Sequence, residues 1–69
     1  MGDISIRIRA FRKLKGLTQI ELAERIGVSV AVLGAVERGT KKPDHKLLQK
    51  ISATLQIDMD ELTQQADKT

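Results

Sequence analysis

The sequence has no cysteine, only one aromatic residue and no long apolar run, and each absence excludes a class of protein. Without cysteine, neither a disulfide nor a cysteine-ligated zinc can brace the fold. No segment approaches the roughly 20 apolar residues that cross a bilayer. The N-terminal segment MGDISIRIRA also has no signal-peptide core. We therefore expect a cytoplasmic protein with no membrane partner.

The single aromatic residue, Phe11, also argues against recognition of single strands or RNA, which needs several exposed rings for base stacking. A chain of 69 residues has room for one domain around one small core. We expect that domain to span 1–69, with a core region at about 4–63 and a polar tail at 64–69. Surface recognition is the better expectation than a deep site.

The charge is unevenly distributed along the chain. Residues 1–42 hold nine Lys or Arg and four Asp or Glu, which gives +5. Residues 43–69 hold three and five, which gives −2, so the two parts sum to the net charge of +3. A basic first part is typical of a surface that binds a polyanion.

Caps and apolar spacing predict five short helices. Ile4, Ile8 and Phe11 follow i, i+4, i+7 spacing, so we prefer a helix here to the strand that the alternation over 4–8 also allows. Gly16 would end this helix. The TQIE segment at 18–21 is a capping box that starts a second helix, which runs to about residue 26 before Gly27.

Ser29 would cap the third helix, and Gly39 would end it. Asp44 would cap a fourth helix with an apolar stripe, and 58–61 would begin a short fifth helix. Three residues between the second and third helices are too few for an antiparallel pair, so the two must cross steeply as a helix-turn-helix. We then expect the outer side of the third helix to be exposed, at Val30, Ala31, Gly34, Ala35 and Arg38.

Four ordered motifs give the chain a resemblance to a known family. They are RAFRKLKGLTQ at 9–19, ELAERIGVS at 21–29, ERGTKKP at 37–43 and the L-x-x-I-x-x-x-L spacing of the fourth helix. The chain resembles the phage repressor and Cro-like (XRE) helix-turn-helix domains. The resemblance implies an all-α, five-helix repressor-like fold and a small transcriptional regulator that binds double-stranded DNA, acting at the nucleoid of a prokaryote or in a phage.

The resemblance also implies roles for individual residues. Helix three would lie in the major groove, and phosphates would be bound by the start of helix two and the 39–42 loop. The expected DNA-binding residues are Thr18, Gln19, Ser29, Val30, Ala31, Val32, Ala35, Arg38, Thr40, Lys41 and Lys42. Lys46 would add charge. Arg12 and Glu37 would form a partly buried ion pair that links helix one to helix three.

The third helix departs from the family pattern, because it has no Gln, Asn, Arg or Lys where bases are usually read. Val30 and Ala31 would contact thymine methyl groups rather than form hydrogen bonds. The glycine at position 34, which weakens a helix by about 1 kcal/mol relative to alanine, suggests a close approach to DNA or to another chain. An alternative reading makes this apolar face a protein-interaction surface with weak or no DNA binding.

An enzyme is the least favoured class. His45, the only histidine, stands beside the helix cap Asp44 with no nucleophile in view. The carboxylates at 58–61 have no calcium-loop spacing and are explained by helix capping. We expect no cofactor and no metal. One domain would cover one DNA half-site, which favours a homodimer or a partner protein.

Overall fold

The computed structural model describes residues 4–63, and the polar tail predicted at 64–69 lies outside the described residues. Within that range the chain forms five helices and no strand: α1 (Ile4–Leu14), α2 (Gln19–Ile26), α3 (Val30–Arg38), α4 (His45–Leu55) and α5 (Met59–Thr63). The first segment is therefore a helix, and the strand alternative is excluded. The all-α fold and the order of five helices match the sequence prediction.

The helix boundaries follow from local caps. The Thr18 hydroxyl accepts from the Glu21 amide at 3.0 Å, and the Thr18 amide donates to the Glu21 carboxylate at 2.9 Å, which completes the predicted capping box. The Ser29 hydroxyl and the Asp44 carboxylate cap α3 and α4 by accepting from the third amide of each helix, at 3.1 and 2.8 Å. Three of the five helices thus start where the sequence places a cap.

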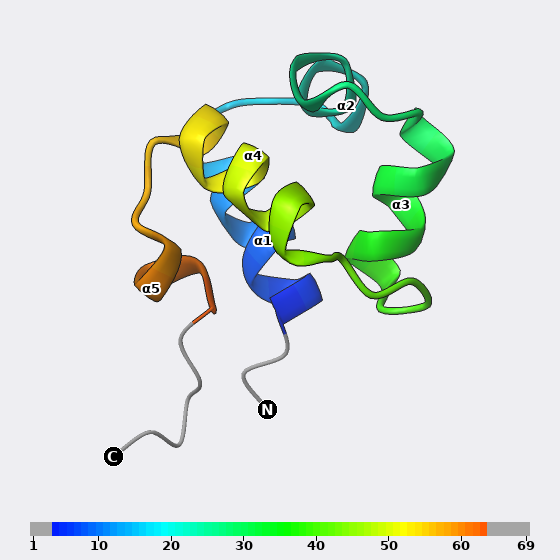
Figure 1. Ribbon diagram of the computed structural model, residues 1–69. Helices are drawn as coiled ribbons and strands as arrows, with labels where there is room; N and C mark the ends of the chain where they lie inside the picture. Colours follow the sequence, from blue (N-terminus) through cyan, green and yellow to red (C-terminus); the bar gives the residue numbers. More distant parts are fainter. Residues whose placement is uncertain (1–3, 64–69) are drawn as a thin grey trace.

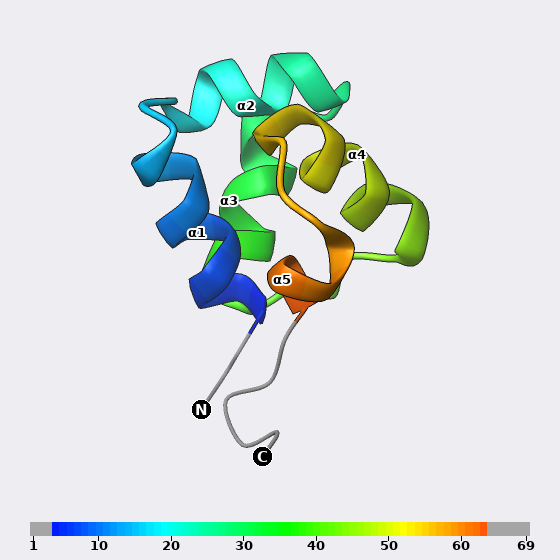
Figure 2. The same ribbon diagram turned by 90° about the vertical axis from the view of Figure 1, so that its left-hand side faces the viewer.

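All five helices contribute to one core. Its buried members are Ile8, Leu22, Ala23, Ile26, Leu33, Val36, Ile51, Leu55 and Leu62. α1 packs against α3, α4 and α5, and α4 packs against α1, α2 and α5. These two helices therefore form the centre of the arrangement (Figure 1). Figure 2 shows α2 running across one end of the molecule, above α3.

The α2–α3 connection gives the fold its functional shape. Gly27 ends α2 at φ +76°, a left-handed conformation that glycine adopts without strain, and three residues later α3 has begun. Both views show α2 and α3 crossing at a steep angle (Figures 1 and 2). Figure 1 shows α3 on the side of the molecule away from α5. One side of α3 is buried against the core, and the other side is left for contact with a partner.

Candidate nucleic-acid interface

The outer side of α3 presents small apolar side chains. Val30 is 43% exposed, and Ala31 is exposed as well. Val32 and Ala35 are half-buried, so they stand at the margin of this surface. Ser29 uses its hydroxyl for the cap of α3 and remains exposed to solvent. The surface that α3 offers to a groove is therefore shallow and has little hydrogen-bonding capacity.

Gly34 was predicted to lie on the exposed side of the third helix, but it is buried. A Cβ atom at this position would lie 3.2 Å from Nη1 of Arg38 and 3.8 Å from Oε1 of Gln19. The prediction was wrong because these long side chains, one from α3 and one from α2, lie over the helix at this point. The close approach at Gly34 is made by this chain's own side chains.

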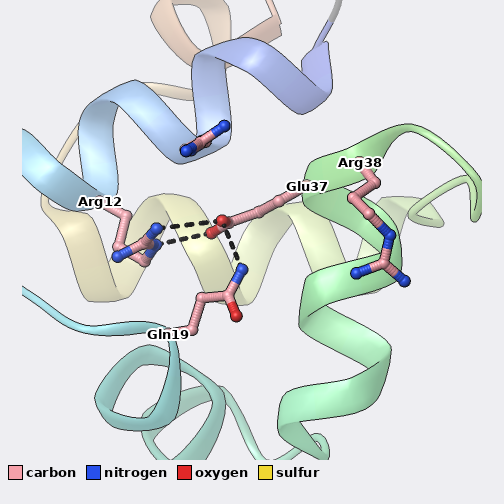
Figure 3. A pocket seen from close by; sticks show the side chains of 5 residues that line it. Arg12, Gln19, Glu37 and Arg38 are labelled. Carbon is pink, nitrogen blue, oxygen red and sulfur yellow. Dashed lines mark hydrogen bonds and ion pairs between the residues drawn. The ribbon is translucent and has the colours of Figure 1, made fainter.

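Arg12, Glu37 and Gln19 form a buried polar network that joins α1, α2 and α3 (Figure 3). Arg12 donates from Nε and Nη2 to the two carboxylate oxygens of Glu37, at 2.7 and 3.1 Å. The side chains of this pair are only 9% and 2% exposed. Gln19 donates from Nε2 to Oε1 of Glu37 at 3.0 Å, and Arg12 also donates to the Leu17 carbonyl at 2.8 Å.

This network has two consequences. A bidentate, shielded ion pair has no exposed charge to offer a ligand, so its role is to hold three helices together. Gln19, the first residue of α2, is at the same time fixed in one orientation. It retains a second amide N–H and its oxygen for a further partner.

The segment after α3 carries the other candidate residues. The Thr40 hydroxyl donates to the Ala35 carbonyl at 3.2 Å, so it completes the end of α3. Lys41 and Lys42 follow it and are exposed. They share a hollow with Lys46 and Lys50 of α4. Its other lining residues are Val28, Val32, Asp44 and Leu47. We call Lys41, Lys42, Lys46 and Lys50 the lysine cluster.

A second basic hollow lies beside the C-terminal end of α3. It is lined by Arg9, Arg12, Gln19, Glu37 and Arg38, and we call it the arginine pocket. The residues predicted from the sequence included Arg38 but not Arg9. They also left out Lys50, whose i+4 spacing from Lys46 was the available signal. Two separate hollows lined with basic side chains thus border α3.

Other kinds of site find no support in the described part of the chain. Residues 4–63 contain no cluster of three or more His, Cys, Asp or Glu side chains suited to a metal ion. No helix among these residues is long and apolar enough to span a membrane.

Comparison with known proteins identifies the fold family. The helix-turn-helix family model matches residues 8–62. The chain is 50% identical over 56 residues to YazB of Bacillus subtilis, an uncharacterized HTH-type transcriptional regulator, and the match covers 81% of each protein. It spans 60% of the length of the transcriptional regulator SinR of the same species, at 36% identity over 67 residues.

Solved structures agree with this match. The structure of SinR in complex with DNA superposes with a TM-score of 0.80 at 38% identity, covering 86% of this chain and 95% of that one. The restriction-modification controller protein C.AhdI of Aeromonas hydrophila gives a TM-score of 0.83 at 33% identity, covering 87% and 91%. The chain therefore belongs to the helix-turn-helix family of Cro/C1-type (XRE) transcriptional regulators.

Proposed function

We propose that this protein binds double-stranded DNA with α3 in the major groove and regulates transcription from the sites that it binds. The observation that carries the proposal is the placement of α3: a helix held across α2 with one side exposed, bordered by two hollows that are lined with basic side chains. The family membership supports the same function, since its members are transcriptional regulators. The proposal gives the chain a binding role rather than a catalytic one, and it places the protein in the cytoplasm with the DNA.

Phosphate contacts supply most of the affinity in this proposal. Lys41 and Lys42 approach the backbone on one side of the groove, and Gln19 and Arg38 approach it on the other side. Thr18, Ser29 and Thr40 support these contacts chiefly by holding the helix ends in place.

Sequence is read through apolar contacts. Val30 and Ala31 reach the thymine methyl groups, with Val32 and Ala35 at the margin of the contact. Because these side chains form no hydrogen bonds, the preference among sites rests on methyl groups and on DNA shape. A homodimer that binds two half-sites about one helical turn apart would supply the remaining affinity.

Selection from a random pool of duplexes, followed by a salt titration on the enriched sequence, tests the function. We expect enrichment of a T-rich palindrome and an affinity that falls steeply between about 50 and 200 mM salt. An unenriched pool together with a flat salt response would reject DNA binding. That result would favour the alternative function, in which the exposed apolar side chains of α3 bind another protein.

A further inference from the structure

The arginine pocket contains more positive charge than its own residues neutralise. Arg9, Arg12 and Arg38 supply three guanidinium groups, and Glu37 supplies one carboxylate. Arg12 is already paired with Glu37 in the buried network. Arg9 and Arg38 are exposed, and neither forms an ion pair with any residue in the range 4–63. Two guanidinium groups without a carboxylate partner among the described residues therefore line one hollow.

Three separate helices contribute these groups. Arg9 comes from α1, Gln19 is the first residue of α2, and Arg38 is the last residue of α3. Figure 3 shows Gln19 turned toward Glu37 and Arg38 on the α3 side of the pocket. Gly34 makes room for this arrangement, because a side chain there would press against Nη1 of Arg38 at 3.2 Å.

An anion that accepts several hydrogen bonds would complete the pocket. The two guanidinium groups repel each other because they carry like charges. An anion between them would attract both and so offset this repulsion. Guanidinium groups suit phosphate oxygens because their N–H donors form a fork that matches the geometry of phosphate. The pocket opens where α2 begins and α3 ends, beside the face that is proposed to enter the groove.

We propose that Arg9 and Arg38 together bind a single DNA phosphate, with the Gln19 side chain completing the site. The inference rests on the proposed DNA-binding function and adds a backbone contact from α1, outside the helix-turn-helix. It makes α1, in addition to α2 and α3, part of the surface that touches DNA. The bound phosphate would also tie α1 to α3 on the exposed side of the buried ion pair.

Neutralising phosphates one at a time tests the proposal. The selected duplex is prepared with an uncharged methylphosphonate at each backbone position in turn, and its affinity for wild type, Arg9→Gln and Arg38→Gln is measured. At one phosphate per half-site, we expect wild type to lose about tenfold in affinity. Each variant should show that loss already on the native duplex and lose little more on the neutralised one.

Arg25→Gln is the matched control, because Arg25 is an exposed arginine on α2 that lines neither hollow. It should remain as sensitive as wild type to every neutralised phosphate. Thermal unfolding of all three variants should match wild type, since the side chains are exposed.

Two results would overturn the shared site: Arg9→Gln keeps full sensitivity at every phosphate, or the two variants become insensitive at different phosphates. If Arg9 bound an acidic protein instead of DNA, Arg9→Gln would keep its full sensitivity, which is the first of these results. If wild type itself binds duplex DNA without salt dependence, the proposed function fails as well, and this result is recognised before any variant is made.

Discussion

The side-chain amide of Gln19 donates to the Glu37 carboxylate at 3.0 Å, so the first residue of α2 is joined directly to the buried ion pair with Arg12. A residue proposed to touch DNA is thereby positioned by the contact that holds α1 against α3. Fold stability and the orientation of the binding face depend on the same carboxylate.

Removal of that carboxylate should destabilise the whole domain. Glu37→Ala leaves the Arg12 guanidinium buried without its partner, and we expect a loss of about 3–5 kcal/mol in the free energy of unfolding. Urea denaturation followed by circular dichroism measures the loss. Glu24→Ala, at an exposed position of α2, is the control and should change little. A melting temperature for Glu37→Ala within a degree or two of wild type would contradict the structural role of the pair.

The attachment of α5 depends on Arg7. Its Nε donates to the Glu61 and Leu62 carbonyls at 3.0 and 3.2 Å, and its guanidinium lies 5.5 Å from the centre of the Phe11 ring. Arg7→Met should therefore cost about 1 kcal/mol and weaken the hydrogen-exchange protection of the Leu62 amide. Arg25→Met serves as the control. Unchanged protection at Leu62 would show that apolar packing alone holds α5.

Gly34 offers a gain in stability. Glycine inside a helix is about 1 kcal/mol less favourable than alanine, and the group nearest to an added Cβ is the flexible end of Arg38, at 3.2 Å. Gly34→Ala should raise the melting temperature by up to about 5 °C. Gly27→Ala should lower it, because φ is +76° at that position. Shifts of the same sign in both variants would contradict this assignment.

The lysine cluster should set the salt dependence of DNA binding. In Lys41→Gln/Lys42→Gln, the slope of log affinity against log salt should fall in magnitude by about 1.8, the value for two lost phosphate contacts. The loss of affinity should be similar for all sequences. Lys13→Gln/Lys15→Gln removes the same charge outside both hollows. Equal slopes in the two double variants would mean that only overall charge matters.

Val30 should read a thymine methyl group. If it does, replacing the contacted thymine by uracil removes one buried methyl and lowers the affinity of wild type by about fourfold. Val30→Ala should no longer distinguish the two bases. Ile6→Ala removes another exposed apolar side chain, on α1, and should leave the discrimination intact. If Val30→Ala still preferred thymine to uracil, a residue other than Val30 would make the methyl contact.

Local rules predicted most of the fold. Thr18, Ser29 and Asp44 start helices because each needs only an amide three residues ahead, and Gly16, Gly27 and Gly39 adopt the positive φ expected of helix ends. The end of α4 was harder to foresee. Gln56 adopts φ +57° there, and glutamine carries no preference for that conformation.

Contacts between distant segments were not predictable in the same way. Arg7 meets α5 more than 50 residues away in the sequence, and Arg9 comes to line the same hollow as Arg38 only once α1 and α3 are packed. Gly34 was placed on the exposed side because helix periodicity describes where the backbone faces. It does not describe which long side chains fold back over that backbone.

Val30 and Ala31 project from α3 without a place in the core. A change of side chain at either position alters what the helix offers to DNA while the interior keeps its packing. Such a surface can acquire a different binding preference one substitution at a time, with no loss of the scaffold on the way. The DNA sequence that the domain prefers can therefore change while its fold stays the same.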